Sequence, residues 1–418
     1  MTSFPVTASV VGLGPAGRIA AHRASARGWD VTAYDPAGGT LPSTIGLWCD
    51  QLPDWLPSDF LAATFQPSVI LVDGTERQLT RTYGVVNNDC LQKLGGFRIE
   101  RRSLTDSEST GADITIVTTG RAHAAVGRGG QVRQLAIGHI FSLDDVPSAH
   151  RRAVLMDFTP ADLNAPETEP ASFSYRIFLD DRTFLIEETI LATPTPMVAG
   201  HLDETGAAVG TGGKADDSVL LELLRRRQKA RLKSLELSED LAIDEEVVSF
   251  PLLANFPSRR GALTHNGPSM GTLFGFAGGW MHPATGYSVG SVIEDVDRFL
   301  ADMEKKGSRS LGTSLSMRLQ RWLRERGLAA LLGFDARQTG AFFRAFFSLP
   351  EKDVFAYLIG TSPLTTLRAM AKVAVPLLKK SPRTCGKLIA GFMRGPGRWR
   401  NRCREAYTSA DLWGDTNN

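Results

Sequence analysis

The sequence predicts an α/β protein: a Rossmann-like dinucleotide-binding domain of the glutathione-reductase type, an inserted mixed β-sheet domain and a helical C-terminal region. A glycine-rich strand–turn–helix pattern opens the chain, alternating strand patterns fill residues 132–190, and helical patterns dominate after Gly290. The 418 residues are too many for one small core and suit two or three closely packed domains.

The first predicted element is a buried strand over residues 8–13, followed by a glycine turn and a helix over residues 15–27. Gly28 is placed to end that helix, and residues 30–35 form the second strand. The turn fits GxGxxG, a pattern whose glycines allow a tight turn and the close approach of a pyrophosphate to the helix N-terminus. At the end of the second strand, an acidic residue typically holds the ribose hydroxyls. The residues predicted to bind the dinucleotide here are Gly12, Gly14, Pro15, Ala16, Gly17 and Asp35.

A second glycine-rich turn, Gly275 to Gly279, follows a short strand pattern roughly 260 residues after the first turn. An NAD enzyme usually completes its nucleotide domain in one contiguous block. A late return after an inserted sheet is typical of FAD enzymes, so we predict FAD as the cofactor. The residues predicted to contact it from this second turn are Gly278, Gly279, Thr285, Gly286 and Tyr287.

These patterns divide the chain into four segments. The predicted nucleotide-binding domain comprises residues 1–130 and 256–300, and the substrate-binding sheet with one long helix, 216–237, occupies 131–255. Residues 40–59, rich in proline and tryptophan, are expected to form an irregular loop. Residues 301–418 form the helical, membrane-facing region, whose helices we expect to break at Pro350, Pro363, Pro376 and Pro382.

The charge distribution points to a membrane surface. The formal net charge is only +2, yet residues 368–404 contain eleven Lys and Arg and no acidic residue, with apolar residues interleaved. Such a basic amphipathic segment suits an anionic bilayer. A solvated helix pair and nucleic-acid binding are the alternatives, and no nucleic-acid recognition motif accompanies the charge. Without a signal-peptide pattern or a run of about 18 apolar residues, the chain is predicted to be cytoplasmic and peripherally attached to the membrane.

The four cysteines form no CxxC pair and lie near no histidine cluster, so no metal site is predicted.

Seven short motifs, kept in order along the chain, carry a family resemblance. They are residues 44–48 (family pattern TYGVW), Tyr83-Gly84 with Asn87 (YGRVN), Gln134, Ala136 and Gly138 (QVAYG), Met156-Asp157-Phe158 (MDWR), residues 185–189 (FLEET), residues 277–287 (AGMVHPSTGY) and residues 341–347 (FFDAFF). Together they resemble the lycopene β-cyclase family of plants and bacteria, from the glycine fingerprint to Phe347. The chain departs from the family pattern at Gln51, where Glu is usual, and at residues 174–176, where YAMP is expected.

The resemblance implies an intramolecular lyase or isomerase that closes a ring on an isoprenoid end by protonation, without net redox change. Reduced FAD would be the active form and would stabilise the carbocation, and NADPH would serve to keep it reduced. Glu187 is implied as the general acid, Glu188 as its support, and His282 as a residue that orients the flavin or closes a proton path. Because strand residues alternate, Glu187 and Glu188 are expected on opposite faces of the sheet. Burial would keep Glu187 protonated near neutrality.

Lycopene is the leading substrate, giving γ- or β-carotene, although the departures leave other substrates open. One alternative is a related terpene cyclase acting on a non-carotenoid polyprenyl or meroterpenoid substrate. Others are an FAD-dependent monooxygenase or prenyl reductase, and a catalytically silent FAD-binding subunit. The Glu187-Glu188-Thr189 motif argues against these last two. The oligomeric state, the number of ends cyclised and the ring double-bond position are not readable from the sequence.

Overall fold

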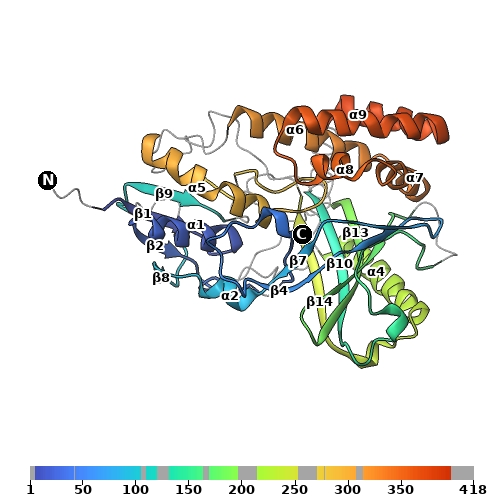
Figure 1. The fold of residues 1–418 in the computed structure, drawn as a ribbon, viewed down its shortest axis with the longest axis horizontal. Helices are drawn as coiled ribbons and strands as arrows, with labels where there is room; N and C mark the ends of the chain where they lie inside the picture. The colour runs from blue at the N-terminus through green and yellow to red at the C-terminus, as the bar shows by residue number, and fades with distance from the viewer. Residues whose placement is uncertain are drawn as a thin grey trace, which may run out of the picture.

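The computed structural model describes residues 5–41, 43–104, 110–119, 131–162, 169–195, 214–252, 271–276, 278–306 and 314–396. Figure 1 shows a parallel sheet with its helices at one end of the molecule, a mixed sheet at the other, and the C-terminal helices lying across the top. The predicted α/β class, with a Rossmann-like sheet, a mixed sheet and a helical C-terminal region, is confirmed.

The parallel sheet is assembled from segments far apart in sequence. Its order is β15 (Thr272–Leu273), β9 (Ile114–Val117), β1 (Thr7–Val11), β2 (Asp30–Tyr34) and β8 (Arg98–Glu100), and every pairing is parallel. Helix α1 (Pro15–Ala26) packs against α5 (Val289–Lys306), and α2 (Asn88–Lys93) lies beside α1. The strand that precedes the second glycine turn thus pairs into the first sheet.

The mixed sheet carries the predicted acid. Its order is β14 (Ala242–Pro251), β10 (Gln131–Ser142), β13 (Thr183–Thr195), β12 (Phe173–Phe178), β11 (Val154–Asp157), β5 (Ser68–Ile70) and β6 (Glu76–Gln78). The pairings are antiparallel except that of β11 with β5. Strands β5 and β6 fall within the segment 1–130 that the sequence assigned to the nucleotide domain. They extend the mixed sheet instead, because a strand's own residues do not reveal which sheet it joins.

A small antiparallel sheet covers one face of the mixed sheet. Its order is β3 (Gly46–Trp48), β7 (Tyr83–Val86) and β4 (Leu61–Phe65), with the short 3-10 helix η1 (Cys49–Gln51) after β3. Val85 and Phe65 pack against Ile140, Ile177 and Leu185 of the mixed sheet. The expectation of an irregular loop over residues 40–59 is therefore wrong at β3, which forms because β7 supplies its hydrogen-bonding partner.

The other face of the mixed sheet is covered by α4 (Lys214–Ser234). Its buried Leu224 packs against Leu135, Ile137 and Ile190, and Leu232 joins a second cluster with Phe141 and Phe184. The predicted helix 216–237 thus ends three residues early. The 3-10 helices η2 (Ser148–His150) and η3 (Glu239–Leu241) lie in connections around this end of the sheet.

The C-terminal helices are α6 (Leu315–Leu331), α7 (Ala336–Phe346), α8 (Glu351–Leu358), α9 (Pro363–Lys380) and α10 (Pro382–Arg394). Three of the predicted proline breaks are confirmed, because Pro350 precedes α8 while Pro363 and Pro382 begin α9 and α10. The predicted break at Pro376 is wrong, since Pro376 lies inside α9. Proline costs the helix one hydrogen bond, but the flanking Val373 and Leu377 are buried in the helical layer and hold the helix together.

Candidate active site

The first glycine turn has room for nothing larger than glycine at two positions. Gly12 has a φ of +92°, and a Cβ there would lie 2.9 Å from the Thr119 side chain. A Cβ on Gly17 would lie 2.0 Å from the carbonyl oxygen of Gly12 and 2.6 Å from Thr118 Oγ1. The Thr118 hydroxyl donates to that same carbonyl at 2.7 Å. The turn is therefore closed tightly against β9, as a dinucleotide loop requires.

Helix α1 opens directly from this turn. Gly14 is its N-cap and Pro15 its first residue, and its first turn contains no acidic side chain. A Cβ on Gly14 would meet no atom within 4 Å, so the space in front of this helix end is open. Unpaired first-turn amides, among them that of Ala16, and the helix dipole favour an anion such as a pyrophosphate there.

Asp35 organises the loop from the end of β2. Its Oδ2 accepts a hydrogen bond from the Leu13 amide at 2.8 Å, and its Oδ1 accepts from the amides of Ala37 at 2.9 Å and Gly39 at 3.2 Å. The sequence predicted a ribose contact at this position, and that contact stays a prediction. What the structure adds is that Asp35 fixes the backbone of the GxGxxG turn.

The second glycine turn meets the first. Gly275 has a φ of +65°, and a Cβ there would lie 2.4 Å from the Cβ of Ala16, so the turn abuts the N-terminus of α1. A Cβ on Gly278 would clash with the Leu273 carbonyl and the Trp280 ring, and Gly279 has a φ of +95°. The two glycine turns thus form one cradle, which fits a dinucleotide. Ala277 lies outside the described residues.

The remaining predicted cofactor residues lie on the side of the mixed sheet. A Cβ on Gly286, whose φ is +77°, would approach the Phe250 ring of β14 at 2.7 Å. The Thr285 hydroxyl accepts from the Tyr287 amide at 3.4 Å. The segment from the second glycine turn to Tyr287 therefore runs from the nucleotide cradle to the sheet that carries the acid.

His282 holds this segment in place. Its Nδ1 accepts from the Ala284 amide at 3.1 Å, so its Nε2 carries the proton and donates to the Tyr357 carbonyl at 3.2 Å. Burial, together with the nearby Arg324 guanidinium, lowers the His282 pKa well below its usual value. With both ring nitrogens bound to main chain, His282 has no free nitrogen for the proton path expected of it, and its geometry is that of a residue that fixes the turn.

Glu187 lies between the mixed sheet and the small sheet, and its side chain is buried, with 8% of its surface exposed. Its Oε1 accepts from the Thr189 hydroxyl at 2.5 Å. Burial raises the Glu187 pKa to about 7, with smaller contributions from the carboxylates of Glu246 and Glu188. A carboxyl group with this pKa holds its proton for a substantial part of the time near neutrality, which suits a general acid.

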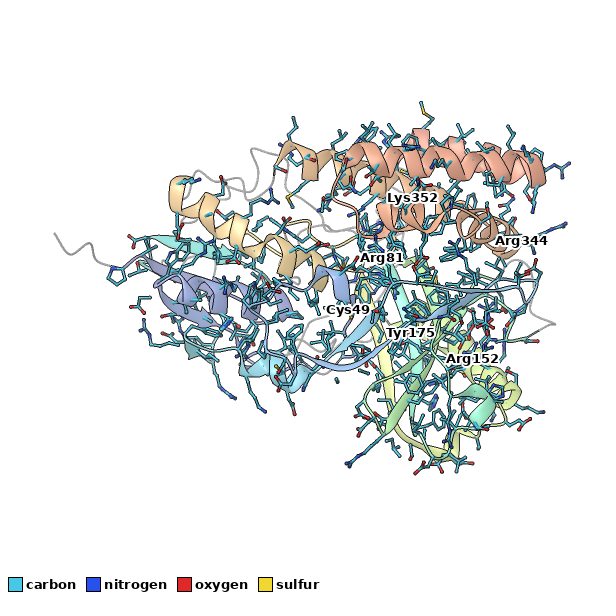
Figure 2. All side chains as sticks on the ribbon, viewed as in Figure 1. Cys49, Arg81, Arg152, Tyr175, Arg344 and Lys352 are labelled. Carbon is cyan, nitrogen blue, oxygen red and sulfur yellow. The ribbon has the colours of Figure 1, made fainter. Side chains whose placement is uncertain are left out.

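Tyr175 and Tyr83 lie beside Glu187, and Tyr287 lies beside Tyr83; Tyr83 is buried, while Tyr175 and Tyr287 are partly buried. Tyr175 stands opposite Glu187 in register on β12, and the Tyr175 hydroxyl donates to that of Tyr83 on β7 at 3.3 Å. The ring of Tyr83 lies beside that of Tyr287, with centroids 6.3 Å apart. Burial raises the pKa of all three phenols well above the usual value, so they are neutral. Figure 2 shows Tyr175 near the centre of the molecule, where its layers meet.

Glu188 points to the opposite face of the sheet, as strand alternation predicts. It is fully buried, accepts from the Ser172 hydroxyl at 2.6 Å, and is paired with Arg231 of α4 at 3.2 Å. Arg231 also approaches Asp157, which is ion-paired with Arg176. Glu188 is thus part of a buried charge network that joins α4 to the sheet, and this placement suits the supporting role predicted for it.

The sequence named Tyr83 and Tyr175 only as parts of motifs and did not name Glu246. Their place beside Glu187 depends on strand register, which no local pattern reveals. One signal was present: Tyr175 lies in the segment that departs from the family pattern.

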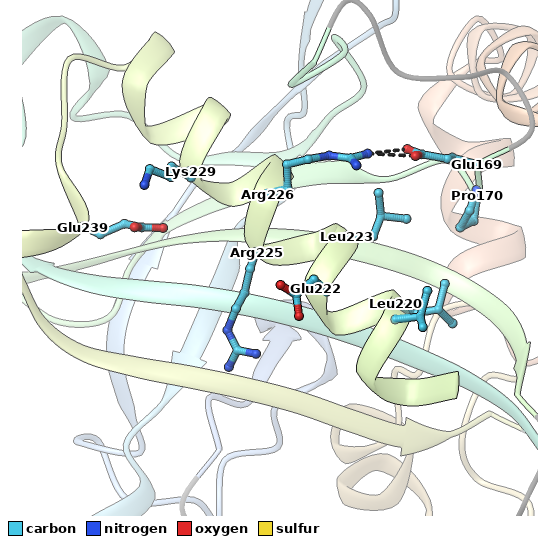
Figure 3. Close-up of a pocket in the computed structure, with 10 residues that line it drawn as sticks. Glu169, Pro170, Leu220, Glu222, Leu223, Arg225, Arg226, Lys229 and Glu239 are labelled. Atoms are coloured by element: carbon cyan, nitrogen blue, oxygen red, sulfur yellow. Dashed lines mark hydrogen bonds and ion pairs between the residues drawn. The ribbon is translucent and has the colours of Figure 1, made fainter. Parts of the chain in front are cut away.

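A surface hollow elsewhere on the molecule is unrelated to this site. It lies along the outward face of α4, where Nη2 of Arg226 donates to both carboxylate oxygens of Glu169 (Figure 3). Its lining contains none of the predicted site residues. Within the described ranges, no helix has the length and hydropathy needed to cross a bilayer, and no cluster of His, Cys, Asp or Glu is arranged to hold a metal ion.

Fold and site together define an α/β protein with a glycine cradle that fits a dinucleotide and a mixed sheet that carries a buried acid. Among solved structures, FqzB is similar with a TM-score of 0.50 and 15% identity, covering 91% of this chain and 96% of that one, which shows the fold alone. The model of the family described as lycopene cyclase protein matches residues 214–377.

Curated relatives match nearly the whole chain. An uncharacterized carotenoid cyclase of Deinococcus radiodurans is 26% identical, covering 91% of this chain and 95% of the relative. A chloroplastic lycopene beta cyclase of Arabidopsis thaliana is 26% identical, covering 90% of this chain and 82% of the relative. The chain is therefore similar to the lycopene cyclase family along most of its length.

Proposed function

We propose that this protein is an FAD-dependent cyclase that closes a ring on a linear isoprenoid end by proton transfer, without net redox change. The leading substrate is lycopene, giving γ- or β-carotene. One observation carries the proposal: in a chain similar to lycopene cyclases, the carboxyl of Glu187 is buried beside tyrosines with its pKa raised to about 7. Protonating an unactivated alkene requires such a neutral acid in a dry environment.

The cofactor would be held by the cradle of the two glycine turns, with its pyrophosphate at the N-terminus of α1. When bound in reduced form, FAD supplies an electron-rich face that stabilises a carbocation, and NADPH would serve only to keep it reduced. This role explains why a reaction without net redox change takes place on a flavoenzyme fold.

The chain's own residues would handle the proton. The Thr189 hydroxyl fixes Oε1 of Glu187, which leaves Oε2 to carry the proton. The small sheet excludes water from this face of the mixed sheet. The aromatic faces of Tyr83, Tyr175 and Tyr287 would stabilise the positive charge that follows protonation. Attack of the neighbouring double bond on this cation closes the ring, and return of a proton from the adjacent carbon to the ionised Glu187 completes an isomerisation in which no atom is gained or lost.

One observation favours a second substrate class, a non-carotenoid polyprenyl or meroterpenoid. Residues 174–176 depart from the family pattern, and Tyr175 of this segment stands in register with Glu187. A departure in the wall beside the acid changes the surface that a substrate would meet, while the proton chemistry stays the same.

The deciding experiment is anaerobic incubation of the protein with lycopene and reduced FAD, followed by product mass and absorption. Cyclisation leaves the mass unchanged and shortens the absorption wavelength. A gain of oxygen or hydrogen would instead indicate a monooxygenase or prenyl reductase. Turnover only of another isoprenoid would support the second substrate class.

Replacing Glu187 by Gln tests the acid directly. Glu187→Gln keeps the shape of the side chain but cannot deliver a proton, so we expect bound flavin to be retained and turnover to fall by at least about 100-fold. Glu245→Gln, an exposed change on β14, is the matched control and should keep full activity. Full activity of Glu187→Gln would remove Glu187 from its role.

We further propose that the C-terminal helices attach the protein to an anionic membrane surface. Helix α9 exposes Leu364, Leu367, Val375 and Leu378 at helical spacing, whereas Val373 and Leu377 face the core. Exposed apolar side chains also lie on the adjacent α6 and α10, at Leu315, Leu319, Trp322, Ile389 and Met393. From residue 363 to residue 394 every charged side chain is Lys or Arg. Apolar and basic groups on one layer match an anionic bilayer, which is also where a long isoprenoid would be stored.

A further inference from the structure

A second carboxylate shares the sheet face of Glu187. On β10, Gly138 pairs with Glu187 of β13 on one side and with Glu246 of β14 on the other. Residues directly opposite each other on antiparallel strands point to the same face. Glu246, Gly138, Glu187 and Tyr175 therefore form one row across four strands.

Gly138 contributes no side chain between the two carboxylates, and the apolar Leu185 side chain packs over it. A Cβ at this position would lie 3.1 Å from the Glu187 Cβ and 2.8 Å from the Leu185 side chain. Because the group that packs over Gly138 is apolar, no polar or charged side chain of this row stands between the two carboxylates. The row thus places two acidic groups in a mostly apolar layer.

Thr44 fixes the position of Glu246 and stabilises its negative charge. The Thr44 amide donates to Oε1 at 2.9 Å and the Thr44 hydroxyl donates to Oε2 at 2.7 Å. Hydrogen bonds from donors favour the ionised form of a carboxyl. Since β14 is an edge strand and Glu246 is only half-buried, water also solvates this charge. Glu187, by contrast, is buried and faces a higher cost of ionisation.

The other groups around Glu187 do not offset this charge. Tyr175 from β12 and Tyr83 from β7 face it as neutral phenols, and Tyr287 lies beside Tyr83. Glu188 lies on the opposite face, and its charge is paired with Arg231. The Glu246 carboxylate adds to burial in raising the Glu187 pKa, although burial is the larger cause.

We propose that Glu246 is a positioning residue that keeps the proton on Glu187, through a fixed negative charge held by Thr44 and facing Glu187 across Gly138. Its consequence for catalysis rests on the proposed function, whereas its effect on the protonation of Glu187 does not.

The test measures the protonation of Glu187 without turnover. The infrared carbonyl band of protonated Glu187, identified by its loss in Glu187→Gln, is titrated with pH in the full-length protein. In the wild type the band should disappear with a midpoint near 7. In Glu246→Gln, which keeps an acceptor for Thr44 but removes the charge, the midpoint should fall by about half a pH unit.

Matched variants make the result specific. Glu245→Gln removes a charge from the adjacent β14 residue, which is paired with Arg225, and should leave the midpoint unchanged. Glu246→Asp keeps the charge and should restore most of the wild-type midpoint. If Glu246→Gln fails to fold, Glu246→Ala must lower the midpoint in the same way, because water can fill the space at this edge strand.

An unchanged midpoint in a folded Glu246→Gln or Glu246→Ala variant would overturn the inference, as would an equal shift in Glu245→Gln. A lowered midpoint in a protein that cyclises no isoprenoid would support the role of Glu246 and refute the proposed function. Cyclisation with an unmoved midpoint would refute the role of Glu246 and leave the proposed function standing.

Discussion

Glu187 and Glu188 are neighbours in sequence with opposite environments. Alternation along β13 points Glu188 toward Arg231 and a network of ion pairs, and points Glu187 toward neutral phenols and aliphatic side chains. The Glu188 carboxylate has a cation that stabilises its charge, while Glu187 has none facing it among the described residues. Two identical side chains are thereby suited to different tasks: Glu188 forms a structural ion pair, and Glu187 is the proposed proton donor.

The raised pKa of Glu187 predicts a specific dependence of stability on pH. The folded-state pKa of about 7 exceeds the 4.5 that is usual for a glutamate side chain, so ionising Glu187 disfavours the folded state. Its contribution to stability is fully present below about pH 4.5 and is lost as pH rises through about 7. The difference amounts to about 3 kcal/mol.

Urea unfolding of the wild type and Glu187→Gln checks this expectation. Relative to the wild type, Glu187→Gln should gain about 3 kcal/mol of stability between about pH 4.5 and about pH 8, because glutamine does not ionise. A constant difference between the two proteins across this range would show that Glu187 is not held neutral by the fold.

At the scale of residues, the sequence predicts what local pattern and motif can encode. Alternation along a strand suffices to predict that Glu187 and Glu188 point to opposite faces of the sheet, and the structure places them so. Tyr175 and Glu246 could not be placed beside Glu187, because their proximity is set by the register of β12, β10 and β14. Register depends on long-range packing, so its consequences appear only in three dimensions.

In the first glycine turn, the glycine that folding requires can be distinguished from the glycine that cofactor binding is expected to require. Gly17 is needed by the turn itself, since its Cβ would lie 2.0 Å from the Gly12 carbonyl oxygen. Gly14 has a φ of −60° and open space before it, so the polypeptide tolerates a side chain there. The close approach of a pyrophosphate is the remaining reason for glycine at position 14.

Two alanine variants should therefore behave differently. Without cofactor, Gly17→Ala should lose about 2–4 kcal/mol of stability, because backbone atoms must move to admit the methyl group. Gly14→Ala should change the stability of the cofactor-free protein by less than about 0.5 kcal/mol, yet weaken flavin binding. Thermal unfolding and flavin-fluorescence titration measure the two effects. Equal losses of stability in both variants would contradict the assignment.

At the scale of elements, prediction succeeded where a residue's effect is local. Pro363 and Pro382 begin helices, and Gly28, with a φ of +84°, follows the end of α1. Prediction from sequence failed where packing against distant residues decides the structure. Pro376 is tolerated because its neighbours on α9 are buried in the helical layer, and β3 exists because β7 pairs with it.

In the whole molecule, the site lies where separate layers meet. The acid comes from the mixed sheet, Tyr83 from the small sheet, and Tyr287 from the segment that leaves the nucleotide cradle. The C-terminal helices cover this junction, since Phe355 of α8 packs edge-on against Trp48 of β3 (Figure 1). Buried residues of α8 and α9 form one hydrophobic cluster with Trp48 and Tyr83. The helical layer that carries the exposed apolar and basic residues is therefore packed against the elements that surround Glu187.

The proposed membrane attachment can be tested on this outer layer of α6, α9 and α10. Vesicles containing phosphatidylglycerol should sediment with the protein more strongly than vesicles of phosphatidylcholine alone, and added salt should weaken the binding by screening the basic residues. Replacing both Leu364 and Leu378 by Ser should reduce binding about tenfold or more, because two exposed apolar side chains no longer enter the bilayer. Replacing Ile243 and Val247 by Ser is the matched control, since both are also exposed but lie on β14. Equal binding of the two double variants, or equal sedimentation with both kinds of vesicle, would show that α9 does not form the docking surface.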